Sequence, residues 1–382
     1  MTPIPQTDPH AGYVQQKPAI DAAVTKVLDS GWYILGREAE AFEARFAGLV
    51  GVAHGIGCGN GTDALELALR ACGIGAGDLV FTVSHTAVAT VAAVERAGAI
   101  PVLIDIEEGG FGMDPAALER SLKSPPVGRP AAVMPVHLYG EPAALDEIAG
   151  LARAHGLRLI EDAAQSHGAE YRGRVTGSIG DFGCFSFYPT KNLGALGDAG
   201  AVVTDNAELA AAAREIREYG WRDRYISAVP GINTRLDPIQ AGILNAKLDS
   251  LMQDNARRQA IAARYDAGLA GLPLVLPTRR DGATHVFHQY VIRTAKRDRL
   301  REHLRQTGIG TGIHYPLPVH LHPAYRGRVP VGPTGLCRSE KAAREILSLP
   351  MYPQLGEAAC DRVVAEIRRF FCDLNSSSVF PE

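Results

Sequence analysis

Short apolar runs alternate with amphipathic segments through the larger part of the chain. The apolar runs have the length and continuity of buried strands, which predicts strands at 79–83, 102–105, 132–136, 157–160, 183–188 and 201–203. Around them, apolar residues recur every three or four positions, which predicts helices at 18–30, 38–50, 87–97, 115–122, 142–155 and 207–219. This alternation predicts an α/β fold in which helices cover both faces of a mostly parallel sheet.

The remaining sequence is predicted to form a smaller α+β unit. A long helix from 238 to about 269 leads into it, and a strand at 286–292 and helices at 297–307 and 358–374 follow. We therefore expect a large domain that includes the N-terminal segment, 1–250, and a small C-terminal domain, 251–382. The last residues, 375–382, are expected to be frayed.

Composition and charge narrow the classes of function. With 46% hydrophobic and 21% charged residues, the chain has the composition of a folded globular protein, and its net charge of −3 gives no basic surface for nucleic acid. No apolar run approaches the roughly 20 residues of a membrane span. The six cysteines are scattered without C-x-x-C spacing, so we expect reduced thiols and a cytoplasmic location.

The histidines in the last third of the chain do not form a recognisable metal site. His314, His320 and His322 have no acid or cysteine beside them. Their spacing fits no common zinc pattern, so we predict no bound metal.

A single lysine stands between a predicted strand and a glycine-spaced loop. Lys191 follows the aromatic strand at 183–188, and burial there would lower the pKa of its amine, as a Schiff-base lysine requires. A solvated loop lysine is the alternative. Upstream, Asp162 follows the strand at 157–160, at the strand end where parallel sheets bind ligands. Such a lysine and acid match the needs of pyridoxal phosphate, which takes an aldehyde carrier and a partner for its ring nitrogen.

Small residues at 54–63 form a predicted loop that opens directly onto a helix beginning near Ala64. Free N–H groups at such a helix start, together with the positive end of the helix dipole, can bind a phosphate. The alternative is an ordinary helix capped by Thr62 or Asp63. No G-x-G-x-x-G fingerprint is present here, which argues against a nicotinamide-linked enzyme such as a sugar reductase.

Two longer motifs carry a family resemblance. The segments EDAAQSHG at 161–168 and SFYPTKNLGALGD at 186–198 resemble those of the DegT/DnrJ/EryC1/StrS family of sugar aminotransferases. The resemblance extends along nearly the whole chain, from Ile4 to Pro353. It implies pyridoxal 5′-phosphate as cofactor and an aspartate-aminotransferase-like fold, fold type I, whose large domain holds a mostly parallel seven-stranded sheet.

The resemblance assigns roles to three residues around the cofactor ring. Lys191 would form the internal aldimine and later move the proton between the cofactor and the substrate carbon, for which its amine must be neutral. Asp162 would keep the pyridine nitrogen protonated. Gln165 would face the 3-hydroxyl group or the ring.

The cofactor phosphate would be held from two elements of the chain. The backbone N–H groups of Gly61 and of Thr62 or Asp63 match the family's helix start, and Ser186 matches the family's serine before the lysine. Asn233 matches an asparagine that, in relatives, reaches the phosphate from the other subunit. The resemblance therefore implies a homodimer with shared active sites.

Stacking on the cofactor ring is the main departure from the family pattern. Relatives often have an aromatic residue after the threonine of this loop, whereas here the order is SHTA at 84–87, so we expect His85 to supply the flat surface. A hydrogen-bonded loop histidine is the alternative.

The sugar nucleotide is expected to meet two further segments. The segment 315–320 resembles the family's Y-P-x-P-x-H segment, which implies Tyr315 and His320 in the substrate cleft. The diphosphate is expected to bind arginines, and the candidates are Arg222, Arg224 and Arg235.

The resemblance implies a ping-pong aminotransferase. L-glutamate would load the amino group, and a keto group of a nucleotide-linked deoxy sugar would receive it, in the biosynthesis of lipopolysaccharide or O-antigen, surface glycans or antibiotics. The segment 85–90 is most similar to relatives acting at C3 of a dTDP-3-keto-6-deoxyhexose, and C4 amination of a UDP-, GDP- or dTDP-4-keto sugar is the alternative. A related sugar 3-dehydratase carries histidine at the Schiff-base position, which Lys191 does not match. A non-catalytic, pyridoxal-phosphate-binding regulatory protein is the alternative of another class.

Overall fold

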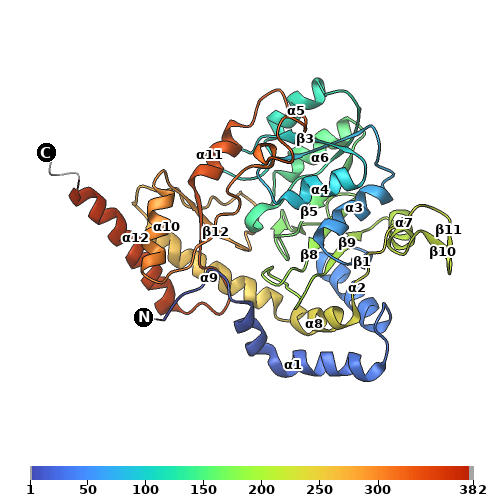
Figure 1. Cartoon of the computed structure of the whole chain (residues 1–382), viewed down its shortest axis with the longest axis horizontal. Helices are drawn as coiled ribbons and strands as arrows, with labels where there is room; N and C mark the ends of the chain where they lie inside the picture. The colour runs from blue at the N-terminus through green and yellow to red at the C-terminus, as the bar shows by residue number, and fades with distance from the viewer. Residues whose placement is uncertain (1, 378–382) are drawn as a thin grey trace.

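A seven-stranded sheet forms the centre of the molecule, and the computed structural model describes residues 2–377 around it (Figure 1). The strands are β1 (His54–Cys58), β2 (Asp78–Val83), β3 (Ile100–Ile104), β4 (Arg129–Val133), β5 (Arg158–Asp162), β8 (Phe182–Ser186) and β9 (Gly200–Thr204). They lie in the order β1-β9-β8-β5-β4-β2-β3. Neighbours are parallel except at β9, which runs antiparallel to both β1 and β8. The mostly parallel sheet confirms the predicted fold class.

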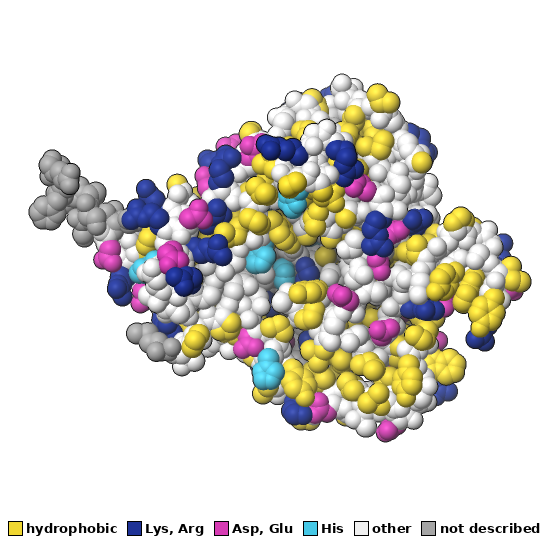
Figure 2. All heavy atoms as spheres, in the orientation of Figure 1, with side chains coloured by type: hydrophobic (Ala, Val, Ile, Leu, Met, Phe, Trp, Pro, Cys, Tyr) yellow, Lys and Arg dark blue, Asp and Glu magenta, His cyan; other side chains and the backbone are white. Residues whose placement is uncertain are grey.

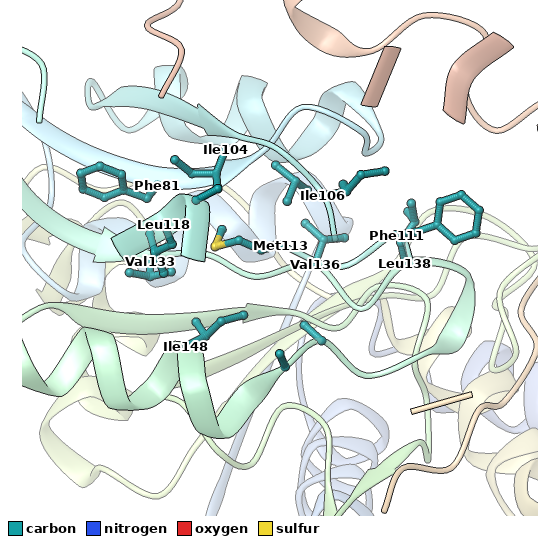
Figure 3. Close-up of a cluster of buried hydrophobic side chains, with 14 of the residues drawn as sticks. Phe81, Ile104, Ile106, Phe111, Met113, Leu118, Val133, Val136, Leu138 and Ile148 are labelled. Carbon is teal, nitrogen blue, oxygen red and sulfur yellow. The ribbon is translucent and has the colours of Figure 1, made fainter. Parts of the chain in front are cut away.

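Helices cover both faces of this sheet. Those that follow its strands are α3 (Gly61–Ala71), α4 (Val88–Arg96), α5 (Pro115–Lys123), α6 (Leu145–Ala154) and α7 (Ala207–Arg217). The side chains of α3, α4 and α7 share a buried cluster with Val80, whereas those of α5 and α6 share another with Phe81 (Figure 3). Adjacent residues of β2 thus enter opposite cores, because side chains alternate along a strand.

Two helices precede the sheet, α1 (Pro9–Ser30) and α2 (Arg37–Val50). The first begins earlier than the predicted 18–30, because the Asp8 side chain caps it and Pro18 lies inside the helix rather than at its start. Its early turns carry few apolar residues, so the hydrophobic pattern did not indicate them.

The prediction of a loop through 54–63 was wrong for its first part, which is the edge strand β1. This strand pairs antiparallel with β9. Helix α2 lies so close that a Cβ atom at Gly55 would come within 2.4 Å of the carbonyl oxygen of Glu43. Tertiary packing therefore requires glycine here, and the low strand propensity of glycine concealed the strand in the sequence.

The predicted long helix 238–269 is two helices, α8 (Pro238–Leu248) and α9 (Leu251–Leu269). The break between them falls where the two domains were predicted to meet. Ile4, from the start of the chain, packs into the buried cluster formed by α9 and the residues that follow it. The division at 250 and 251 stays a prediction.

The C-terminal part is built around a two-stranded sheet. Its elements are β12 (Tyr290–Arg293), α10 (Arg297–Gln306), α11 (Cys337–Glu345), β13 (Ile346–Leu349) and α12 (Glu357–Ser377). The strand predicted at 286–292 begins later, because Phe287 has a left-handed φ of 44° that strands do not accommodate. Of the tail predicted to fray, residues 375–377 continue α12 and the rest lies outside the described residues. No helix in the described part of the chain is long and apolar enough to cross a membrane.

Candidate active site

A cavity of about 470 Å³ lies at the carboxyl ends of the parallel strands, where open α/β sheets bind their ligands. Figure 2 shows a hollow near the middle of the face it draws, with histidine and basic side chains beside it. The predicted site residues that line the cavity are Gly61, Thr62, Asp162, Gln165, Ser186 and Lys191. Segments far apart in the sequence therefore meet as predicted for these positions.

Lys191 stands in the loop that follows β8. Its backbone N–H donates a 2.8 Å hydrogen bond to the carbonyl of Tyr188, which fixes the turn that carries it. The side chain is half-buried, and burial lowers the pKa of its amine to about 8, although the nearby carboxylate of Asp162 acts in the opposite direction. A substantial fraction of this lysine is therefore neutral near pH 8 and able to accept a proton.

Asp162 is the last residue of β5 and is 5% exposed. One carboxylate oxygen, Oδ2, accepts a 2.8 Å hydrogen bond from the hydroxyl of Thr90, and Oδ1 accepts a 3.3 Å bond from the N–H of Ala164. Burial raises the pKa of Asp162, and the Thr90 hydrogen bond opposes that shift. The carboxyl group is thus fixed in position and would gain most from a cationic partner in the cavity.

A pair of threonines supports this carboxylate, and no motif in the sequence indicated this contact. Thr90 lies in the first turn of α4, and its hydroxyl is 2.9 Å from the hydroxyl of Thr86. Both residues are buried and both line the cavity. Only the folded chain brings α4 to the end of β5, so the contact could not be seen in the spacing.

The Gln165 amide is held in one orientation by two partners. Its Oε1 accepts a 2.7 Å hydrogen bond from the N–H of Tyr139, and its Nε2 donates a 3.3 Å bond to the hydroxyl of Tyr315. The Tyr139 hydroxyl in turn donates to the carbonyl of His314. Tyr315 is therefore close to the cavity through Gln165, but it is not among the residues that line it.

The start of α3 forms the other end of the cavity. Its cap is Asn60, whose side chain accepts a 2.9 Å bond from the N–H of Asp63, so the alternative caps Thr62 and Asp63 were wrong. The N–H groups of Gly61 and Thr62 have no partner inside the helix and line the cavity together with Ser186. A Cβ atom at Gly61 would lie 2.5 Å from the Cβ of Ser186, so glycine is required for this close approach.

The side chain of Asp63 turns toward other protein groups. It contacts Arg96 at 3.0 Å and accepts a 2.7 Å hydrogen bond from the hydroxyl of Thr234. Asp63 itself does not line the cavity, whereas Arg96 does. Arg96 was not predicted as a site residue, because nothing in its helical pattern distinguishes it from a solvated arginine.

His85 lies behind the cavity wall, whereas a ring that stacks on the cofactor would form part of that wall. It is 0% exposed, and its ring stacks on Phe111 with centroids 5.6 Å apart. Its Nε2 lies 3.0 Å from the Tyr139 hydroxyl, and burial lowers its pKa to about 4. The next two residues of this bend, Thr86 and Ala87, line the cavity instead.

The residues predicted for the diphosphate lie on another surface. Arg222, Arg224 and Arg235 line a hollow of about 770 Å³ beside the hairpin of β10 (Trp221–Asp223) and β11 (Ile226–Ser227), which projects from the molecule (Figure 1). Within this one chain, the fold does not bring these arginines to the strand-end cavity.

Two further predicted residues also lie outside the cavity. Asn233 is exposed, and its backbone pairs with Glu218 near the same hairpin. His320 is held between the hydroxyl of Ser84 at 2.8 Å and the carboxylate of Glu340 at 3.3 Å. Their predicted roles toward a partner subunit and a substrate stay predictions.

The walls of the cavity fit pyridoxal phosphate. The amine of Lys191, whose pKa is lowered, and the buried acid Asp162 form one part of the wall. In another part, the N–H groups of Gly61 and Thr62, which have no partner inside the helix, suit a phosphate. The Ser186 hydroxyl adds a donor at that end. Among the described residues, Tyr188 is the one aromatic residue in the wall.

Comparison with known proteins gives one consistent result. A model of the DegT/DnrJ/EryC1/StrS aminotransferase family matches residues 14–368. The chain is 47% identical over 369 residues to the dTDP-3-amino-3,4,6-trideoxy-alpha-D-glucose transaminase of Streptomyces venezuelae, with 96% of each chain covered. It is 44% identical over 368 residues to a UDP-N-acetyl-3-dehydro-alpha-D-glucosamine 3-aminotransferase of Acidithiobacillus ferrooxidans, with 96% of this chain and 98% of the relative covered. The crystal structure of S. venezuelae DesV in complex with a ketimine intermediate has a TM-score of 0.93 and 46% identity, and the match covers 97% of this chain and 99% of DesV.

Proposed function

Because this chain belongs to the DegT/DnrJ/EryC1/StrS aminotransferase family and is a pyridoxal-phosphate-dependent nucleotide-sugar aminotransferase, we propose that it aminates C3 of a dTDP-linked 3-keto-6-deoxyhexose with L-glutamate as amino donor. The observation that carries this proposal is the pairing of Lys191 and Asp162 in one cavity, in a chain whose similar relatives are named for an amino group at C3. Those names include both dTDP and UDP sugars, so the experiment must vary the nucleotide as well as the sugar.

The cofactor and the protein have separate tasks. When bound, pyridoxal phosphate supplies an aldehyde that carries the amino group and a ring that accepts electrons from the neighbouring carbon. Lys191 supplies the amine that holds the cofactor and then removes and returns a proton at the reacting carbon. It can do so near pH 8 because burial lowers the pKa of its amine to about 8.

Asp162 holds a proton at the pyridine nitrogen. A cation placed there relieves the unfavourable burial that raises the pKa of this carboxyl group. The hydroxyl of Thr90, 2.8 Å away, keeps the carboxylate oriented toward the cavity. Gln165, fixed by the backbone of Tyr139, offers its amide to the oxygen substituent of the ring.

The donors proposed for the cofactor phosphate are already held in place by the fold. The N–H groups of Gly61 and Thr62 are fixed by the first turn of α3, and the hydroxyl of Ser186 stands at the end of β8. These donors would hold the phosphate of a bound cofactor in the same cavity that Lys191 lines.

We place the substrate's diphosphate at a homodimer interface. Exposed aromatic side chains, among them Trp32 and Tyr225 at 65% and 70% exposure, line the hollow that also holds Arg222, Arg224 and Arg235. Figure 2 shows hydrophobic side chains gathered on this side of the molecule. A second copy that covers them would bring its Asn233 and arginines toward the partner's cavity, where Tyr315 and His320 stand near the substrate.

The test is a panel of 3-keto and 4-keto sugars linked to dTDP, UDP or GDP, each incubated with the holoenzyme and L-glutamate. We expect release of 2-oxoglutarate with a dTDP-3-keto-6-deoxy sugar and a new amine at C3 in the NMR spectrum of the product. Amination at C4 alone would overturn the C3 assignment. Absence of turnover with every sugar, by protein that binds the cofactor, would instead favour the regulatory alternative.

A further inference from the structure

Arg96 stands in the wall of the strand-end cavity, at the end that suits a phosphate. It closes α4, and it lines the cavity together with Gly61 and Thr62 of α3. The guanidinium is anchored to α3 by two carboxylates, Asp63 at 3.0 Å and Glu66 at 2.7 Å. The start of α3, whose residues Gly61 and Thr62 line the cavity, therefore also holds this arginine beside it.

Both ion pairs of Arg96 use the same nitrogen, Nη2. A guanidinium is planar and carries five N–H donors, and a phosphate can accept two of them at once. Within the described part of the chain, the ion pairs leave Nε and Nη1 for such an acceptor. The side chain is 49% exposed, so Arg96 is accessible to a ligand.

The charges in the cavity wall also favour Arg96 as the group that meets a phosphate. Among the described residues, those with formal charge in its wall are the cations Arg96 and Lys191 and the acids Asp162 and Asp198. Lys191 is partly neutral near pH 8 because burial lowers its pKa to about 8, whereas an arginine keeps its charge at any working pH. Arg96 is thus the permanent positive charge available to a phosphate dianion.

We propose that Arg96 binds a phosphate group in this cavity through Nε and Nη1 while Nη2 remains on Asp63 and Glu66. Two groups share this chemistry: the phosphate ester of the cofactor and the diphosphate of the nucleotide sugar, the second of which rests on the proposed function. In either case the two acids act as positioning residues that keep the guanidinium at the start of α3.

The chain offers a matched control in Arg70. Its Nε contacts the other oxygen of Glu66 at 2.8 Å, but Arg70 does not line the cavity. Removal of either arginine deprives the same buried carboxylate of one cation. Arg96 also pairs with Asp63, so a loss of binding beyond that of the Arg70 variant comes from contact with the ligand or from the cation lost at Asp63, and Arg96→Lys, which keeps a cation there, separates the two.

The experiment compares Arg96→Gln, Arg96→Lys and Arg70→Gln. The first arm titrates apoprotein with pyridoxal phosphate, and the second titrates holoenzyme with dTDP or UDP by calorimetry, so neither requires amination of any sugar. We expect Arg96→Gln to weaken the binding of at least one ligand about 10-fold. Arg96→Lys should weaken that binding less, because lysine keeps the positive charge although it lacks the planar guanidinium that can bind two oxygens at once. Arg70→Gln should change both affinities less than about 2-fold.

The arms separate the two sources of phosphate. Weakening of pyridoxal phosphate assigns Arg96 to the cofactor, and weakening of the nucleotides alone assigns it to the substrate. Equal affinities for Arg96→Gln and Arg70→Gln in both arms would overturn the proposal. If Arg96→Gln melts at a lower temperature than Arg70→Gln, Arg96→Lys, which keeps the charge on Glu66, decides the question. A failed sugar panel with these binding effects intact would count against the substrate assignment and not against Arg96.

Discussion

The strand-end cavity and the hollow beside the β10–β11 hairpin both hold residues predicted from the sequence, but they differ in how those residues are fixed. In the cavity, Asp162 and Gln165 are buried and each has two protein partners. In the hollow, Arg222 is exposed and Arg235 reaches Glu218 only at 3.9 Å. The groups proposed to perform chemistry are thus held by buried partners within one chain, whereas the arginines proposed for substrate recognition have longer contacts at the surface, Arg222 with Glu215 at 3.4 Å and Arg235 with Glu218 at 3.9 Å.

The cause of this difference is the topology. Parallel strands deliver their carboxyl ends to one edge, so residues that follow β5 and β8 meet without help from another chain. The hairpin has no such constraint, because β10 and β11 pair only with each other. Variants of the cavity residues, and a mixture that includes an Asn233 variant, distinguish an active site that is complete within one chain from one that needs residues of another chain's hollow.

The largest effect is expected for Lys191→Ala. Loss of the amine removes both the attachment of the cofactor and the proton carrier, and we expect 2-oxoglutarate release to fall by about 10³-fold or more. Lys247→Met is the control, because burial lowers the Lys247 pKa to about 8 as well, yet Lys247 does not line the strand-end cavity. The control should keep the absorbance of bound cofactor, and equal losses in both variants would contradict the role of Lys191.

Asp162→Asn separates activity from stability. An asparagine cannot hold the pyridine proton as a carboxylate does, so activity should fall by about 10²-fold. Burial raises the pKa of Asp162 in the folded apoprotein, so the carboxyl group destabilises the fold increasingly as pH rises through that raised pKa. The apoprotein of the variant should therefore melt no lower than wild type at pH 8, and a lower melting temperature would contradict the proposed electrostatics.

The sequence allowed the residues that line the cavity to be predicted better than the residues that hold them in place. Lys191 and Asp162 follow apolar strands and belong to recognisable motifs, so their meeting in one cavity could be predicted, whereas their roles stay predictions. Thr90 could not be linked to Asp162, because the contact depends on how α4 packs against the sheet. The direction of the His85 side chain could not be predicted for a related reason, since it depends on the partners available on each side, here Phe111 and Tyr139.

Thr90→Val tests that missed support. Valine has nearly the same shape but no hydroxyl, so Asp162 would lose the 2.8 Å hydrogen bond to Oδ2 and its pKa would rise further. We expect activity to fall by about 10-fold, with an altered pH dependence of kcat and the cofactor still bound. Thr86→Val is the matched control, because Thr86 contacts Thr90 rather than the carboxylate. A loss in Thr86→Val as large as in Thr90→Val would mean that packing, not the hydrogen bond, matters.

The smallest expected signal is the recovery of activity when two impaired variants are mixed. It tests most directly whether the active site is complete within one chain. Asn233→Asp would place a carboxylate against the phosphate of the partner's cofactor, and Lys191→Ala would disable its own cavity. After subunit exchange, half of the dimers are hybrids, and each hybrid has one site with both Lys191 and Asn233 intact, so about a quarter of wild-type activity should return. Mixing Lys191→Ala with Asp162→Asn should restore nothing, because both residues lie in the cavity of one chain and every hybrid site lacks one of them. Recovery in the second mixture, or none in the first, would show that the division between the two regions is wrong.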